Sequence, residues 1–260
     1  MSTSAAWRRL ALTLGLALTL GVEPSDAQVA PDDPWRTVET EHFRVTFPAG
    51  LEPLATRAGV RAEAAYSELS RDLVPIGPGP VDILLTDHLD LSNGLAGMSP
   101  WRRILVYARP PTDAAGLQYF DEWMELVVTH ELAHIAHLDH QGTLARITRT
   151  VFGRPPATWP FFPNAMVPRW TTEGLATWYE SSLSGAGRVK GTDHEMVVRT
   201  AALEGKLEDL GQAGGDSPVW PGGNRYYVFG GQFLADLVDR QGEEGLPGFV
   251  EAISGQWIPL

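Results

Sequence analysis

The chain of 260 residues contains no cysteine. This absence excludes disulfide bonds, cysteine nucleophiles, thiolate zinc sites and iron–sulfur clusters. Any metal ion that the protein binds must therefore be held by histidine and carboxylate side chains. Hydrophobic residues make up 43% of the chain and charged residues 20%, so the composition supports a folded core rather than a disordered chain.

Positive charge is also scarce. Twenty lysine and arginine residues face 32 aspartate and glutamate residues, which gives a formal net charge of −12. Contacts to nucleic-acid phosphates need clustered lysine and arginine, so we expect no nucleic-acid partner. An anionic membrane surface offers such a chain no electrostatic attraction either.

Long apolar runs are missing as well. Residues 10–22 form an apolar run of 13 residues directly after two arginines, which is short of the ~20 residues that span a bilayer. Ser25 and Ala27 then place small residues three and one before a cleavage point ahead of Gln28. This pattern predicts a secretory signal peptide over residues 1–27. We therefore expect an exported protein, periplasmic or extracellular, with no membrane attachment after cleavage.

Strand patterns come first along the rest of the chain, and helix patterns follow. Alternating apolar residues and short apolar runs predict strands over residues 37–47, 81–86 and 103–108. Near-helical spacing of apolar residues predicts helices over residues 51–73, 117–139, 171–182, 196–204 and 227–241. Residues 141–169 are rich in proline and aromatic residues, which predicts an irregular connection.

This order of elements predicts an α+β fold. We expect a flexible lead-in over residues 28–36, followed by one domain over residues 37–260. Residues 37–140 would form a small mixed-sheet lobe together with the helix that ends near residue 139. Residues 141–260 would form a helical lobe, with a metal cleft between the two lobes.

The segment His130-Glu131-Leu132-Ala133-His134 is an HExxH pattern. Because four residues are a little over one helical turn, both imidazoles leave one face of a helix and can hold a single cation. Glu131 is then directed beside the metal ion, which is the position of a general base acting on water. The alternative is a solvated helix with two histidines. Apolar residues on the other faces argue against it, because they predict a buried helix whose polar residues need partners.

Two histidines and a water leave one protein ligand to be found, and two residues compete for that role. His140 fits the spacing HExxHxxxxxH of the metzincins, but His137 stands where metzincins have the glycine that ends the helix. An unbroken helix would carry His140 past the metal ion. Glu173 lies at the start of a later helix, for which Thr171 or Thr172 is a suitable cap, and we favour Glu173 as the third ligand.

The HExxH pattern followed by Trp170-Thr171-Thr172-Glu173-Gly174-Leu175-Ala176 (W-x-x-E-G-x-A) resembles the gluzincin metallopeptidases of the peptidase MA type. The resemblance implies a zincin-like fold that binds one zinc ion per chain. The residue roles that it implies are metal ligation by His130, His134 and Glu173, with Glu131 as the catalytic base.

The same families carry a Y-x-x-G pattern at the start of a later helix, which Tyr227-Val228-Phe229-Gly230 matches. The resemblance implies that the Tyr227 hydroxyl lies near the substrate carbonyl, where it would stabilise the developing oxyanion. A purely structural role for Tyr227 as a core aromatic residue remains the alternative.

Further short matches resemble exported bacterial proteins in which such a domain precedes a Tol-type β-propeller. They are Phe152-Gly153-Arg154, Phe162-Pro163-Asn164 and Pro168-Arg169-Trp170. The expectation is therefore either a fragment of a propeller-containing protein or a free-standing version, with a partner or the missing propeller at the C-terminus. The aminopeptidase relatives hold the free amine of the substrate with an acid in a G-x-M-E-N stretch, and residues 94–100 lack that acid. An endopeptidase is thus favoured over an aminopeptidase.

Four other features carry weaker expectations. We expect His137 to be a satisfied or solvated histidine and His194 to be a surface histidine, rather than cleft residues. Glu180 is either the partner of a ligand histidine or a helix-surface acid, and these two readings stay open. Residues 103–107 are predicted to be the edge strand along which a peptide substrate pairs.

Taken together, the residues predict an exported zinc metallopeptidase, a hydrolase acting on a peptide or protein substrate. The alternative from another class is a non-catalytic envelope module that retains the zinc site and binds polypeptide. A metal-dependent hydrolase of a non-peptide bond is the third possibility. Glu131 counts against the binding module, because such a module has no structural need of a base beside the metal ion.

Overall fold

The computed structural model describes residues 31–257 apart from 113–116, 118 and 216–219. The predicted signal peptide lies outside the described residues, as do residues 28–30 of the predicted lead-in. Contacts within the chain separate Met1–Asp32 from a second compact unit, Asp33–Leu260, which contains every element described below. Among the described helices, none is long and apolar enough to cross a membrane.

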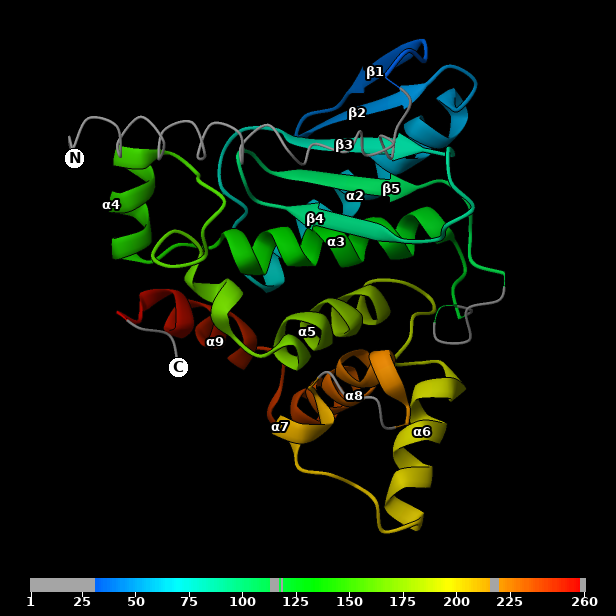
Figure 1. The fold of residues 1–260 in the computed structure, drawn as a ribbon, viewed down its shortest axis with the longest axis vertical. Helices are drawn as coiled ribbons and strands as arrows, with labels where there is room; N and C mark the ends of the chain where they lie inside the picture. The colour runs from blue at the N-terminus through cyan, green and yellow to red at the C-terminus, as the bar shows by residue number, and fades with distance from the viewer. Residues whose placement is uncertain (1–30, 113–116, 118, 216–219, 258–260) are drawn as a thin grey trace, which may run out of the picture. The chain divides into compact units, whose positions relative to one another are not determined.

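Within the described residues, five strands form one mixed sheet in the order β1-β2-β3-β5-β4 (Figure 1). β2, β3 and β5 are parallel, and β1 and β4 pair antiparallel at the two edges. The strands are β1 (Trp35–Glu39), β2 (Phe43–Pro48), β3 (Val81–Thr86), β4 (Gly94–Gly97) and β5 (Arg103–Tyr107).

Two of the strand predictions are wrong. The segment predicted as one strand over residues 37–47 is a hairpin, because the chain turns between Glu39 and Phe43. The strand at residues 103–107 is not an edge strand, because β4 pairs with it and separates it from solvent at that edge. β4 has only four residues and two of them are glycine, so it carries too little strand pattern to be predicted.

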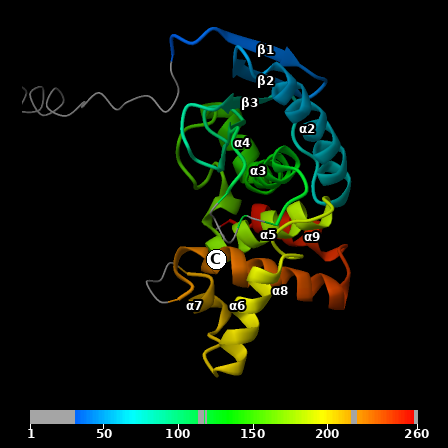
Figure 2. The ribbon, with the colours of Figure 1, turned by 90° about the vertical axis from the view of Figure 1, so that its right-hand side faces the viewer.

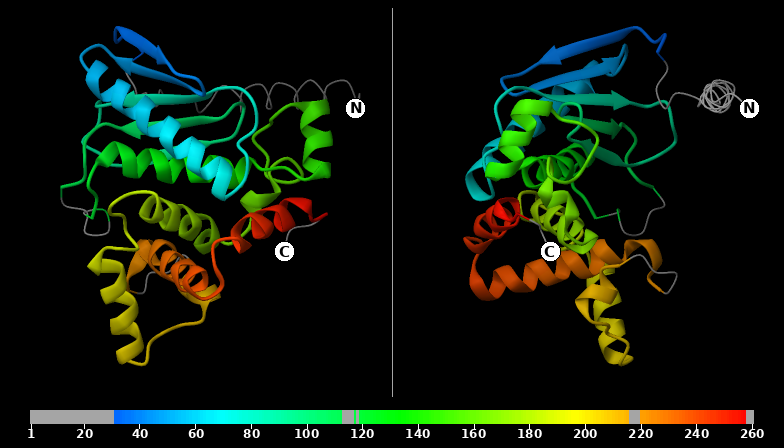
Figure 3. Two further views of the ribbon diagram at one scale, coloured as in Figure 1. Left: turned by 180° about the vertical axis from the view of Figure 1, so that it is seen from behind. Right: turned by 60° about the vertical axis from the view of Figure 1, so that its left-hand side comes forward.

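The sheet buries one face beneath two helices. Its inward side chains are at most 1% exposed: Phe43, Val45, Phe47, Val81, Ile83, Leu85, Ile104 and Val106. α2 (Glu52–Asp72) and α3 (Trp123–Asp139) cover this face (Figure 3). Charged residues occupy the other face, where the Arg44 guanidinium donates to Asp82 across β2 and β3 at 2.7 and 3.0 Å. The mixed sheet and its helices make the protein an α+β fold, as predicted.

α3 is the most buried helix of this unit. Apart from Glu125, every residue from Trp123 to His137 is buried. The helix has this environment because α2 and the sheet pack on one side and α5 (Arg169–Ser182) packs on the other. The predicted polar residues His130, Glu131 and His134 therefore lie inside the protein rather than on a solvated face.

The remaining helices form a layer beyond α3. α8 (Arg225–Gln241) lies alongside α5 on the side away from the sheet (Figure 2). The other helical elements are α4 (Thr143–Phe152), η2 (Pro163–Met166), α6 (Thr192–Leu203), α7 (Leu210–Ala213), η3 (Gly222–Asn224) and α9 (Gly245–Gly255).

The predicted connection over residues 141–169 is thus partly wrong, because it contains α4 and η2. Only Ala145 of α4 is buried, and Ile147 and Val151 are exposed, so the apolar spacing of this helix does not mark a core-facing stripe. The predicted threonine cap of α5 is also wrong. Pro168 occupies the N-cap position, and no side chain caps the helix.

A pair of glycines lets α5 and α8 approach until their backbones touch. A Cβ atom built on Gly174 would lie 2.6 Å from the carbonyl carbon of Gly230, and one built on Gly230 would meet the carbonyl oxygen of Trp170. Gly174 belongs to the W-x-x-E-G-x-A pattern, and Gly230 belongs to the Y-x-x-G pattern. They bring Glu173, the residue before Gly174, and Tyr227, one turn before Gly230, to neighbouring helices in direct contact.

We predict that Gly230→Ala lowers the free energy of unfolding by about 1–3 kcal/mol, because the added methyl group collides with backbone that cannot give way. The matched control is Gly248→Ala in α9, where a Cβ atom meets nothing within 4 Å. This control should be neutral or stabilise by up to about 1 kcal/mol, since alanine favours helix. Urea unfolding measures both, and equal effects of the two substitutions would contradict the close contact.

Glu63 of α2 holds the turn between β1 and β2. Its Oε1 accepts hydrogen bonds from the Thr40 hydroxyl (2.5 Å) and the His42 amide (2.7 Å), and its Oε2 accepts from His42 Nδ1 (2.7 Å). Burial opposes the ionisation of Glu63. The hydrogen bonds from Thr40 and His42 outweigh burial, so the pKa of Glu63 lies below its ordinary value.

Because the pKa of Glu63 is depressed in the folded state, its stabilisation is complete above the ordinary carboxyl pKa and is lost as the pH falls through the folded value. We expect Glu63→Gln to cost about 1–3 kcal/mol at neutral pH, with the difference from wild type shrinking below about pH 4. Urea unfolding across that pH range tests this. Glu68→Gln, on an exposed pair with Arg71 of the same helix, should cost less than about 0.5 kcal/mol.

Candidate metal centre

The two histidines of the HExxH pattern and Glu173 meet at one point between α3 and α5. Among the described residues, they form the group of His, Asp and Glu side chains that could hold a metal ion. His130 Nε2 and His134 Nε2 lie 3.1 Å apart. Glu173 Oε2 lies 3.2 Å from the nitrogen of His134 and 3.5 Å from that of His130.

These separations fit a tetrahedral cation. A cation bound about 2.0–2.1 Å from each of three donors would hold the donors roughly 3.3–3.4 Å apart. The three observed separations fall on both sides of that value. The Glu173 Oε2 atom is buried and has no hydrogen-bond partner among the described residues. A buried carboxylate oxygen needs such a partner, and a bound cation would provide it.

The electrostatics of the three residues also favour positive charge between them. Burial and the charge of Arg188 lower the pKa of His130, but the nearby carboxylates of Glu173 and Glu180 outweigh both and raise it to about 9. Burial opposes the ionisation of Glu173, but its contacts with both histidines hold its pKa far below the usual range. A bound cation supplies the positive charge that this arrangement stabilises, so the residues fit a metal ion.

His140, the other candidate for the third ligand, does not join this group, and neither does His137. His140 caps the C-terminus of α3, and Glu173 rather than His140 completes the triad, as the unbroken helix predicts. His137 is fully buried, and neither ring nitrogen has a hydrogen-bond partner among the described residues. The prediction of a satisfied or solvated His137 is therefore wrong. Burial is the main cause that lowers its pKa to about 3, so this histidine is neutral.

Glu131 is 5% exposed and lies against the edge strand β4. A Cβ atom on Gly94 would lie 2.6 Å from Glu131 Cγ and 2.7 Å from Glu131 Oε1, so only glycine leaves room for this carboxylate. Burial raises the pKa of Glu131 above its ordinary value, and the two histidines partly oppose this. The sequence does not reveal this role of Gly94, because its contact with Glu131 joins segments 37 positions apart.

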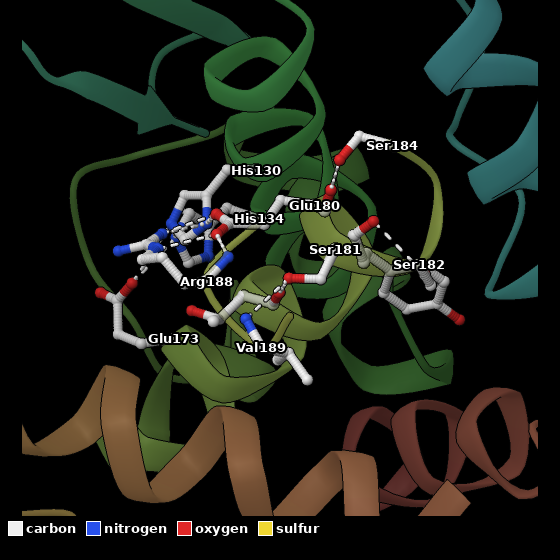
Figure 4. A network of polar contacts seen from close by, with 11 residues as sticks. His130, His134, Glu173, Glu180, Ser181, Ser182, Ser184, Arg188 and Val189 are labelled. Carbon is white, nitrogen blue, oxygen red and sulfur yellow. Dashed lines mark hydrogen bonds and ion pairs between the residues drawn. The ribbon is translucent and has the colours of Figure 1, made fainter. Parts of the chain in front are cut away.

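Glu180 is the partner of a histidine rather than a helix-surface acid, because it accepts a hydrogen bond from His130 Nδ1 at 2.8 Å. Glu173 and Glu180 are seven residues apart, so both lie on the face of α5 that contacts α3, and they reach the histidines from different sides (Figure 4). Arg188 completes the network by donating to both carboxylate oxygens of Glu180. Nothing in the sequence points to Arg188, since it lies in a loop without a recognisable pattern.

The candidate metal-binding residues and Arg188 line one cavity of about 690 Å³. Its walls include β4, the HExxH side chains, Glu173, Arg188 and Tyr227 of α8. His194 also lines it. The prediction of a surface histidine is wrong, because His194 lies in the first turn of α6 and is 2% exposed. Burial and the charge of Arg188 lower the pKa of His194 to about 4.

We compared the chain with models of known protein families and with curated protein sequences, and neither comparison yields a match.

We predict that Glu173→Ala weakens metal binding by more than about 100-fold, because it removes one of three donors rather than an outer partner. His140→Ala should leave the affinity within about twofold of wild type, since His140 lies outside the triad. Competition with a chromogenic chelator measures both affinities. The opposite ranking of the two variants would assign the third ligand to His140.

Proposed function

We propose that this protein is a zinc-dependent metallopeptidase, with an endopeptidase favoured over an aminopeptidase. One observation carries the proposal. Three donor atoms at tetrahedral separations share a cavity with Glu131, a buried carboxylate that is not one of those donors. A binding module would have no need to bury an acid there.

The donor set supports zinc as the metal. Two imidazoles and one carboxylate, without cysteine, are the three-ligand set of catalytic zinc sites that keep a fourth position open. A zinc ion held there supplies Lewis acidity, which polarises a substrate carbonyl and lowers the pKa of water. The ligands would be His130 Nε2, His134 Nε2 and Glu173 Oε2.

Glu131 is the proposed general base. Its carboxylate would take a proton from the attacking water and pass it to the nitrogen of the leaving amine. Burial raises its pKa above the ordinary carboxyl value, which brings its proton affinity closer to what this transfer requires. The lack of a Cβ atom at Gly94 leaves the space beside β4 that this side chain occupies.

Tyr227 is the proposed donor to the carbonyl oxygen. It lines the cavity from the first turn of α8, and its ring lies 6.1 Å from the ring of His130. Burial and the charge of Glu173 raise the pKa of Tyr227, so the hydroxyl keeps its proton and can donate it in a hydrogen bond. Negative charge that develops on the carbonyl oxygen would be stabilised by that bond.

The edge strand β4 supports a peptide as the substrate. Its residues border the cavity, and its outer edge offers backbone groups that can pair with an extended chain. Among the described lining residues, the acidic side chains are Glu131 and Glu173, and both have other roles. No further described carboxylate faces the cavity to hold a free amine, which favours cleavage within a chain.

The proposal includes export to the periplasm or the extracellular space. Its support is the sequence pattern of residues 1–27, with paired arginines, a short apolar run and small residues before Gln28.

We expect Glu131→Gln to lower kcat by about 100- to 10,000-fold, because it removes the group that accepts and returns the proton. Metal content should stay at one zinc ion per chain, since Glu131 is not a ligand. Incubation with a diverse peptide mixture and mass spectrometry of the products measures cleavage.

The matched control is Glu125→Gln on the same helix, where Glu125 pairs with Arg61 away from the cavity. It should cleave like the wild type. A zinc-bound wild-type protein that cleaves no peptide would contradict the peptidase and favour the polypeptide-binding module. Cleavage that Glu131→Gln retains would contradict the assigned base.

A further inference from the structure

Arg188 lies in the loop between α5 and α6, and its guanidinium is 7% exposed at the wall of the cavity. A cation this deeply buried must be compensated by its neighbours. Among the described residues, it contacts the carboxylate of Glu180, the ring of Tyr227 and Nδ1 of His130.

The first contact is a forked ion pair. Arg188 Nε donates to Glu180 Oε1 and Nη2 donates to Oε2, both at 2.7 Å, and the Arg188 amide donates to Oε1 at 3.2 Å. The Glu180 side chain is completely buried. Arg188 therefore holds both carboxylate oxygens of Glu180 in fixed positions.

The position of Glu180 decides which nitrogen of His130 faces the other two donors. His130 Nδ1 lies 2.8 Å from Glu180 Oε2 and 2.9 Å from Arg188 Nη2. Arg188 Nη2 already donates to that oxygen at 2.7 Å, and the Nδ1–Oε2 distance is the shorter of the two, so we assign the Nδ1 proton to a hydrogen bond with Glu180. The lone pair of His130 is then on Nε2, the nitrogen that faces His134 and Glu173.

The second contact fixes Tyr227. The guanidinium carbon of Arg188 lies 4.4 Å from the centre of the Tyr227 ring. A cation over a ring face is attracted to it, and more strongly when water is excluded. This contact restrains the ring and hence the direction of its hydroxyl.

We propose that Arg188 is a positioning residue which couples the metal ligand His130 to Tyr227 through a single guanidinium. It orients the His130 imidazole through Glu180, and it orients the Tyr227 ring by direct contact. The part that concerns Tyr227 rests on the proposed peptidase function. The part that concerns His130 rests only on metal binding.

Zinc affinity tests the first part. We expect Arg188→Met and Glu180→Gln each to weaken zinc binding by about 10- to 100-fold, the usual effect of losing an outer partner of a ligand histidine. The double variant should bind no more weakly than the single ones, because both substitutions break the same link. Arg199→Met, an exposed arginine on α6, is the matched control and should bind zinc like the wild type.

Kinetics and spectroscopy test the second part. Arg188→Met should lower kcat with KM within about twofold, and combining it with Tyr227→Phe should add little to the loss. Resonances of isotope-labelled Tyr227 should shift in Arg188→Met and stay unchanged in Arg199→Met. Arg188→Lys keeps the charge but loses the fork, so it should recover kcat and zinc affinity only in part.

Wild-type zinc affinity in a folded Arg188→Met variant would overturn the link to His130. An unshifted Tyr227 resonance, or fully additive losses in kcat, would overturn the link to Tyr227. If Arg188→Met does not fold, Arg188→Lys decides by the same measurements, and full wild-type values would refute both links. If the wild type cleaves no peptide, the proposed function fails, while zinc affinity and the Tyr227 resonance still decide the role of Arg188.

Discussion

Three polar side chains of α3 are buried where this helix passes between the sheet and α5. His130, Glu131 and His134 are each at most 8% exposed, and groups that lose water at this depth need compensating partners. Neighbouring elements supply these partners. α5 presents Glu173 to one side of the histidine pair and Glu180 to another, and Arg188 compensates Glu180 in turn. The three donor atoms of His130, His134 and Glu173 surround a point where a cation fits.

Close backbone contacts place these groups as firmly as the charges do. Gly174 follows Glu173 and lies against Gly230, so the carboxylate on α5 and Tyr227 on α8 are held on helices in direct contact. Gly94 of β4 leaves the space that Glu131 occupies. Glycine at these positions is explained by distance rather than by a turn, because any Cβ atom would collide with a neighbouring element. Strand β4, Glu131, Glu173 and Tyr227 therefore share one packing arrangement.

Short-range patterns in the sequence were enough to predict much of the fold and of the candidate metal centre. The spacing of His130 and His134 depends only on helix geometry, and the apolar surroundings of the motif predict a buried helix. The α+β class follows from strands that precede helices, and α2 begins and ends within one residue of its predicted limits. The choice of Glu173 over His140 also has a local reason, since a helix without a break carries His140 past the site.

Contacts between distant segments were decided only by the tertiary structure. Nothing near residues 94–97 predicts an edge strand, because a short glycine-containing segment becomes a strand only when β5 pairs with it. The burial of His137 and His194 depends on which helices pack over them, and Arg188 acquires its partners only when its loop returns to α3 and α8. The sequence by itself therefore predicted the fold class, the candidate metal-binding residues and the proposed base, since these depend on periodicity within single elements. The tertiary structure alone decided how the ligands are oriented and which strand borders the cavity, because those properties arise from packing between elements.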